Sequence, residues 1–281
     1  MIKIDNYFLN KLLGKCSYGE VYYTIKKGSN TPYATKRMKR TELENTIYFE
    51  NLMKEINILE KTSHKNLIRI ESLKVSQNNY YIIMEYCDGG TLKENCEKYQ
   101  EKFKTPFPEK IVQHLMRQLV DVVNFLHERE IILGEIKPEN ILIKYNNKET
   151  KDNLDILHSE LKLINFCCEK YKQYKSAKKD SMDLLILETN MERFDPTVPN
   201  YENDIRSLGV VCYQLITGEI EIEKWNIKIP VNISAEAISF LINMLHFFPD
   251  KRSIAKTLLN HPSLQKYFSD FTDLHLKIFE N

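Results

Sequence analysis

Residues 131–143 read IILGEIKPENILI. A polar centre, Lys137 to Asn140, is followed at once by the apolar run 141–143, which is typical of a short strand. Upstream, residues 109–128 predict a helix, because apolar side chains recur there at helical spacing. Those side chains are Ile111, Leu115, Leu119, Val122 and Leu126. The stretch therefore joins a helix to a strand through a short polar loop.

The part of the chain before residue 87 is predicted to be rich in strands. Apolar alternation marks the segments 7–13, 20–25 and 33–37. The tripeptide Gly28-Ser29-Asn30 predicts a turn, and a helix is predicted over 47–61, followed by two more strands that end near Tyr86. After the link Cys87-Asp88-Gly89-Gly90 the pattern becomes helical.

This order predicts an α+β chain in which a small β-rich lobe precedes a larger helical lobe. We expect an N-lobe over 1–86, a hinge over 87–90, a C-lobe over 91–266 and a C-terminal tail over 267–281. With 281 residues, 42% of them hydrophobic and 28% charged, the composition is that of a globular protein. A formal net charge of +1 does not indicate nucleic acid as a partner.

The chain has six cysteines but no Cys-x-x-Cys pair, so neither a zinc site nor a disulfide framework is predicted. The residues after Met1 lack the charged-then-apolar order of a signal segment, and the longest apolar runs are too short to cross a bilayer. We therefore expect no membrane partner, and a location in the cytoplasm or on an intracellular assembly.

Several motifs occur in the order found in protein kinases. The segment LGKCSYGEVYY resembles the glycine-rich loop, KPEN resembles part of the catalytic loop, and LKLINFCC resembles the metal-binding segment. Across residues 5–265 the sequence is therefore similar to the protein kinase superfamily, which implies a bilobal protein-kinase-like fold. The segment MEYCDGGTL and the long polar insert 144–160 are similar to the autophagy-initiating Unc-51-like branch.

The resemblance implies an ATP site. Lys36 would hold the phosphates and Glu55 would hold Lys36. Met84 would close the back of the pocket, and Glu85 to Cys87 would offer backbone groups to adenine. The implied ATP-binding residues, including three that sandwich the adenine ring, are Gly14, Gly19, Val21, Ala34, Lys36, Glu55, Met84, Glu85, Cys87 and Leu142.

The reaction centre departs from the family pattern. Glu135 stands where kinases have the catalytic aspartate, so a carboxylate is kept but is displaced by about 1 Å. Lys137 and Asn140, which contact the transferred phosphate and a metal ion in the family, are retained. Asn165 replaces the aspartate that holds magnesium, and its neutral carbonyl is a poor substitute for a charged ligand. We therefore expect Asn140 and Asn165 to bind magnesium weakly or not at all, and ATP binding to be weak.

Two neighbouring positions and the glycine-rich loop also differ. Leu133 and Gly134 replace a histidine and an arginine, and without that arginine, control by phosphorylation of the activation segment is not expected. Cys16 puts a side chain where the backbone would approach phosphate closely. Leu133 would make the side-chain stack that links the lobes more apolar. The other expected members of that stack are Leu59, Ile70 and Phe166.

Two residues of the C-lobe are expected to be structural. Asp204 would bind the backbone of the catalytic loop, and Arg252 would pair with the glutamate of an Ala-Pro-Glu motif that this chain lacks. Counting back from Asp204 favours Glu192 for that position, whereas matching on the preceding methionine favours Phe194.

Three interpretations of function follow. The first, which we expect, is a pseudokinase without enzyme activity that binds a protein partner as a scaffold or allosteric regulator. The second is an unconventional active Ser/Thr protein kinase that uses Glu135 as its base. The third is a structural subunit of a large assembly with a vestigial pocket. Residues 135 and 165 distinguish the first two interpretations, and no residue distinguishes the first from the third.

Overall fold

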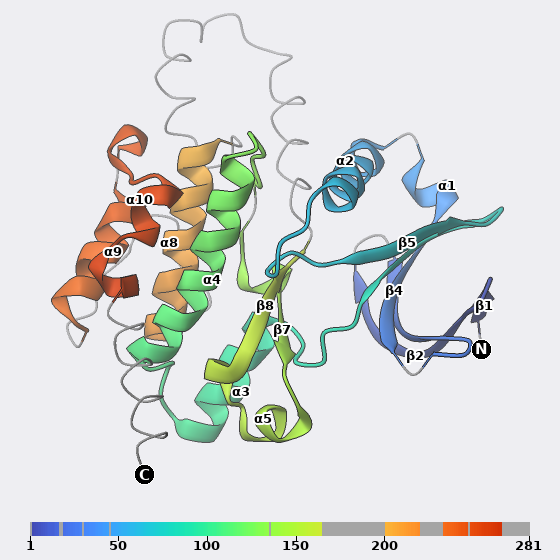
Figure 1. Ribbon diagram of the computed structural model, residues 1–281, viewed down its shortest axis with the longest axis horizontal. Helices are drawn as coiled ribbons and strands as arrows, with labels where there is room; N and C mark the ends of the chain where they lie inside the picture. Colours follow the sequence, from blue (N-terminus) through green and yellow to red (C-terminus); the bar gives the residue numbers. More distant parts are fainter. Residues whose placement is uncertain are drawn as a thin grey trace, which may run out of the picture.

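The computed structural model describes residues 2–16, 19–29, 31–44, 46–134, 136–164, 200–219, 233–246 and 248–265. In Figure 1 a curled antiparallel sheet with one long helix beside it forms one part of the molecule, and a group of packed helices forms the other. The chain passes between them after β6 (Asn79–Glu85) and before α3 (Leu92–Phe103). The predicted α+β fold with a small strand-rich lobe and a larger helical lobe is confirmed.

The sheet of the N-lobe has six strands in the order β1-β2-β3-β4-β6-β5. Besides β6 they are β1 (Ile2–Ile4), β2 (Tyr7–Cys16), β3 (Gly19–Lys26), β4 (Pro32–Lys39) and β5 (Ile70–Val75). The predicted strands are present but longer, because backbone pairing continues beyond the residues that alternate in polarity. The three residues of β1 and the four of α1 (Arg40–Leu43) are additions to the prediction, since such short elements show no period.

The register of the sheet determines which side chains of β4 face the space between the lobes. Val21 of β3 lies directly opposite Lys36 of β4. Because side chains alternate along a strand, Ala34 and Lys36 share one face and Thr35 points to the other. On that other face Thr35 is fully buried, and Thr24 Oγ1 donates a hydrogen bond of 2.8 Å to its hydroxyl. The sheet thus presents a cation and small apolar groups on one face.

The helix predicted over 47–61 is confirmed as α2 (Ile47–Lys61). It begins after Thr46, whose side chain accepts a hydrogen bond from a backbone N–H of the first turn. Leu52 and Ile56 are buried against the sheet in an apolar cluster of the N-lobe. Glu55 is also buried and lies at the cavity between the lobes.

The C-lobe is built around α4 (Glu109–His127), which ends one residue before the predicted boundary. Figure 1 shows α4 next to α8 (Tyr201–Thr217), with α9 (Ala235–Leu245) on the other side of α8. The short helix α10 (Ala255–Leu259) also packs against α4. Leu115, Leu119 and Leu126 of α4 are almost fully buried, as their helical spacing predicts. Within the described residues, no helix has the length and apolarity needed to span a bilayer.

A two-stranded hairpin, β7 (Ile141–Tyr145) and β8 (Ser159–Leu163), lies between the lobes (Figure 1). The strand expected at 141–143 is therefore confirmed as part of β7. The polar insert between the two strands contains a helix, α5 (Lys148–Asn153), which the sequence interpretation did not include. Asn147 and Thr150 form a capping box at its start, and this local hydrogen bonding orders a segment with no apolar period.

Candidate functional site

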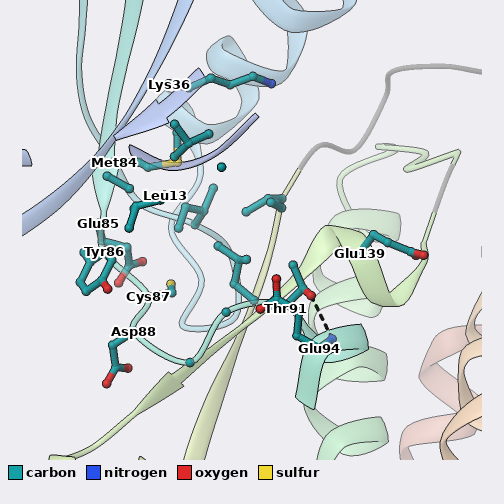
Figure 2. Close-up of a pocket in the computed structure, with 18 of the residues that line it drawn as sticks. Leu13, Lys36, Met84, Glu85, Tyr86, Cys87, Asp88, Thr91, Glu94 and Glu139 are labelled. Carbon is teal, nitrogen blue, oxygen red and sulfur yellow. Dashed lines mark hydrogen bonds between the residues drawn. The ribbon is translucent and has the colours of Figure 1, made fainter. Parts of the chain in front are cut away.

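A cavity of about 870 Å³ lies between the two lobes. This volume falls in the range of small-molecule sites, roughly 300–1,000 Å³. Figure 2 shows Glu85, Tyr86, Cys87 and Asp88 following one another along one side of it, with Lys36 on the N-lobe side. Of the ten residues predicted to bind ATP, all but Gly19 line this cavity.

The part of the cavity near the hinge has apolar walls. Val21 and Ala34 come from neighbouring strands of the N-lobe sheet, and Leu142 comes from β7 in the other lobe. Leu13 and Ile164 also line the cavity. A slot with apolar surfaces contributed by both lobes suits a flat aromatic ring.

Two charged side chains are buried at the same cavity. Lys36 of β4 is 7% exposed and Glu55 of α2 is 5% exposed. Burying a charge is costly unless an opposite charge or a ligand compensates it. In the expected arrangement, Glu55 pairs with the Lys36 ammonium beside an anionic group. The burial of both side chains is consistent with that arrangement. The Lys36–Glu55 contact itself stays a prediction.

The loop that precedes β7 is attached to α8 through a fully buried carboxylate. Asp204 is 0% exposed, and it accepts hydrogen bonds from the backbone N–H groups of Leu133 at 2.9 Å and Gly134 at 2.8 Å. A ring nitrogen of His127 lies 2.9 Å from the same carboxylate. Gly134 has a φ of +82°, in the left-handed region that favours glycine. The loop backbone is thus positioned by a residue about seventy positions further along the chain.

The 3₁₀ turn Pro138–Asn140 carries the next candidate residues. Asn140 is 7% exposed; its N–H donates to the carbonyl of Lys137, and its own carbonyl accepts from Ile164 N–H, both at 2.9 Å. The turn therefore lies against the chain directly after β8. Neither Lys137 nor Asn140 lines the cavity, whereas Glu139 does. Glu135 and Asn165, the two most informative candidates, lie outside the described residues.

The cavity, the buried lysine and the anchored loop agree with the comparison to known proteins. The family model described as "Protein kinase domain" matches residues 7–264. The chain belongs to the protein kinase family. An Aurora kinase of Debaryomyces hansenii is 28% identical to this kinase domain over 276 residues, which are 92% of this chain and 62% of that protein.

Other relatives of this kinase domain carry different names at similar identity. Aurora kinase C of Mus musculus is 23% identical, with 94% of this chain and 93% of that protein covered. Serine/threonine-protein kinase atg1 of Dictyostelium discoideum is 26% identical, with 93% and 39% covered. These similar identities do not distinguish the Unc-51-like branch from the Aurora kinases. The chain spans less than two thirds of the Debaryomyces and Dictyostelium relatives.

In this kinase domain Leu133 is a core residue. It is 0% exposed and belongs to the same apolar cluster as Leu59, and Ile70 packs against that cluster. Phe166, the fourth expected member of the stack, lies outside the described residues. The leucine therefore supports packing at a position where the family has a polar histidine.

Restoring the family residue is expected to destabilise the protein. We expect Leu133→His to lower the free energy of unfolding by about 1–3 kcal/mol, because a polar ring would enter a fully buried apolar site. The midpoint of thermal unfolding should fall by roughly 2–10 °C. Leu133→Met is the matched control, since a swap that conserves volume usually costs less than about 1.5 kcal/mol. Equal melting temperatures for the two variants would contradict the packing role.

The glycine-rich strand turn has two glycines with different roles. A Cβ at Gly19 would collide with the backbone carbonyl of Arg37 on β4, so close strand packing requires glycine there. A Cβ at Gly14 would meet no atom within 4 Å, so the space at this edge of the cavity is left open by the protein. Cys16 lines the cavity, and its thiol donates a hydrogen bond to the carbonyl of Gly19 at 3.3 Å. Gly19 is thus a packing residue in the described structure.

A protein kinase domain implies ATP binding, typically with magnesium. The cavity fits the nucleotide, because it combines apolar walls with a buried lysine. Of the two residues expected to face the metal, Asn140 carries a neutral amide oxygen, a weaker ligand for magnesium than a carboxylate, and Asn165 lies outside the described residues. Weak magnesium binding therefore stays a prediction. Within the described residues, no group of three or more His, Cys, Asp and Glu side chains is placed to hold a metal ion.

Arg252 is buried in the C-lobe and is 9% exposed. It donates to the carbonyls of His246 at 3.0 Å and Glu202 at 2.9 Å, and to the side chain of Asn203 at 3.1 Å. Burial and the positive charge of Arg206 lower the pKa of Arg252 to about 10. Glu192 and Phe194 lie outside the described residues, so the choice between them stays open.

Several residues at the cavity were missed by sequence reasoning. Leu13 is the first residue of the LGKCSYGEVYY segment and directly precedes Gly14, so its apolar side chain was a usable signal. Thr91 and Glu94 lie at the rim and hydrogen-bond each other in the capping box of α3 (Figure 2). Ile164, which follows β8, and Glu139 of the 3₁₀ turn line the cavity only because the tertiary fold brings these segments to it. Their sequence context gave no signal of this.

Proposed function

We propose that this protein is a pseudokinase, a kinase domain that keeps a nucleotide pocket, has lost effective phosphoryl transfer, and acts by binding a protein partner. One observation carries the proposal. The adenine-side walls and the buried Lys36 are retained at the cavity, whereas Glu135 and Asn165 replace the base and the metal-binding carboxylate. A domain that keeps its fold without its reaction can act through binding, as a scaffold or an allosteric regulator. We place it in the cytoplasm or on an intracellular assembly.

Nucleotide binding in this proposal is weak and largely independent of magnesium. The apolar walls from the two lobes exclude water from both faces of the base, and Lys36 offsets part of the phosphate charge. Asn165 has no negative charge with which to attract a divalent cation. Magnesium should therefore add little to the affinity for ATP.

Thermal unfolding with and without ATP tests this proposal. A ligand that binds only the folded state stabilises it by RT ln(1 + [L]/Kd), which is roughly 1.4 kcal/mol at ten times Kd. We expect millimolar ATP to raise the melting temperature by about 2–5 °C, equally in magnesium and in EDTA. Lys36→Met should reduce both shifts, because it removes the buried cation of the phosphate end.

Other results of this unfolding experiment would contradict the proposal. A shift seen only with magnesium would refute the metal-independent site and favour an active enzyme. No shift in either buffer would favour the third interpretation, a structural subunit whose pocket is vestigial. Shifts that persist in Lys36→Met would place the nucleotide away from the proposed phosphate end.

The second candidate is an active Ser/Thr protein kinase that uses Glu135 as its base. It is favoured by the relatives, which carry kinase names, and by the retained Lys36, Glu55 and Asn140. Glu135 also keeps a carboxylate at the position of the base. The two candidates differ in the rate of phosphoryl transfer, for which the pseudokinase requires a very low value.

A further inference from the structure

The carboxylate of Glu85 is held from both lobes. Glu85 is the last residue of β6 and is 7% exposed. Its carboxylate accepts a hydrogen bond of 3.0 Å from the backbone N–H of Arg69, which directly precedes β5. Its own N–H donates to the carbonyl of Arg69 at 2.9 Å. Glu85 and Arg69 therefore share two hydrogen bonds that fix the start of the hinge against the N-lobe sheet.

Two lysines of the C-lobe hairpin reach the same carboxylate. Lys144 of β7 donates to Glu85 Oε2 at 2.8 Å, and Lys162 of β8 lies 3.3 Å from Oε1. Lys162 is buried, with a side chain 8% exposed, and it also donates to the carbonyl of Lys65. One carboxylate thus joins the hinge, the N-lobe sheet and the C-lobe hairpin.

The charge state of this cluster agrees with its geometry. Burial alone would raise the pKa of Glu85, but the hydrogen bond from Lys144 and the charge of Lys162 outweigh it, and the pKa is lowered. The neighbouring Cys87 differs, because burial and the Glu85 charge raise the pKa of its thiol to about 12. Glu85 is therefore ionised at neutral pH, and Cys87 is a neutral lining group.

We propose that Glu85 is a positioning residue whose side chain holds the backbone of residues 85–87, which leads into the hinge, in the orientation that receives a 6-aminopurine base. This inference rests on the proposed nucleotide occupancy. Glu85, Tyr86 and Cys87 line the cavity, and the Glu85 carboxylate is held by contacts in both lobes. A carboxylate with two hydrogen-bond donors and a further ion pair holds its position more strongly than a neutral amide does.

The binding preference for adenosine over inosine tests whether the backbone of residues 85–87 is held in this orientation. The 6-amino group of adenosine donates a hydrogen bond, whereas the 6-oxo group of inosine only accepts one, so a backbone carbonyl in a fixed position selects adenosine. We expect Glu85→Gln to reduce the ratio of the two dissociation constants, inosine over adenosine, about five- to tenfold. Calorimetric titration of the purified chain with each nucleoside gives that ratio.

Glu160→Gln is the matched control. Its carboxylate lies 3.7 Å from the same Lys162 but is 48% exposed and does not line the cavity, so the ratio should not change. Lys144→Gln provides a second variant if Glu85→Gln does not fold, and it should lower the ratio in the same direction.

The outcomes separate this inference from the proposed function. A Glu85→Gln protein that melts earlier but keeps the wild-type ratio would overturn the positioning role and leave only a structural one. An unchanged ratio in Lys144→Gln would do the same. If the wild-type protein bound neither nucleoside and ATP did not raise its melting temperature, nucleotide occupancy and this role would both fail. If ATP raised the melting temperature but neither nucleoside bound, only this role would fail. An equal drop in the Glu160→Gln control would also overturn the inference.

Discussion

The purified protein is expected to transfer phosphate to a generic protein substrate at least ~10⁴-fold more slowly than an ordinary protein kinase. Displacing the base by the length of one methylene costs about 10²-fold, because Glu135 reaches further than the aspartate it replaces. Removing a strong electrostatic stabiliser at Asn165 costs a further ~10²–10³-fold. From a typical turnover of roughly 1–100 per second, the remaining rate is too low for signalling. Incorporation of radioactive phosphate over time measures it.

Reverting both substitutions provides a sharp control. Glu135→Asp with Asn165→Asp is expected to recover about tenfold at most, because effects of residues that act as a unit are not additive. Cys16, Leu133 and Gly134 would still differ from the family pattern. Ordinary kinase rates in this double variant would favour a conditionally active enzyme. Robust transfer by the wild-type chain that disappears in Lys36→Met would establish the active kinase outright.

Asp204→Ala is expected to lower the free energy of unfolding by about 3–5 kcal/mol, because it removes one member of a buried polar network and leaves the others unpaired. The backbone N–H groups of Leu133 and Gly134 and the ring of His127 would lose their acceptor. The melting temperature should fall by roughly 6–15 °C, and chemical denaturation should show a matching loss.

Two comparisons keep this prediction specific. Asp152→Ala removes an exposed carboxylate on α5 and should change stability by no more than about 0.5 kcal/mol. Asp204→Asn keeps the size and one acceptor oxygen, so it should cost less than Asp204→Ala. A loss in Asp204→Ala no larger than in Asp152→Ala would show that the loop does not depend on this carboxylate.

Local sequence patterns were sufficient for the main elements of the fold. The helical spacing of Leu115, Leu119 and Leu126 predicted α4 to within one residue, because a buried helix face imposes a regular period. The same reasoning could not find β1 or α5. The first is too short to show a period, and the second depends on capping hydrogen bonds rather than on apolar burial.

The residues of the candidate site could be predicted where they belong to a sequence motif. Nine of the ten expected ATP-binding residues line one cavity, although they come from five strands, one helix and the hinge. Gly19 is the exception, because its glycine is required by contact with Arg37 rather than by a ligand. Ile164 and Glu139 were missed, since reaching the cavity depends on how distant segments pack, whereas Leu13 was missed despite its place directly before Gly14.

The family, the order of the two lobes and the chemical groups at the reaction centre follow from residue type and spacing alone. The substitutions at Glu135 and Asn165 are visible directly in the sequence. The contacts of the Glu85 carboxylate follow only from the tertiary structure. Its partners lie 16, 59 and 77 positions away, and only folding brings two lysines and a backbone N–H onto one carboxylate. Such a contact leaves no local pattern, because each partner on its own is an ordinary residue of a strand or a loop.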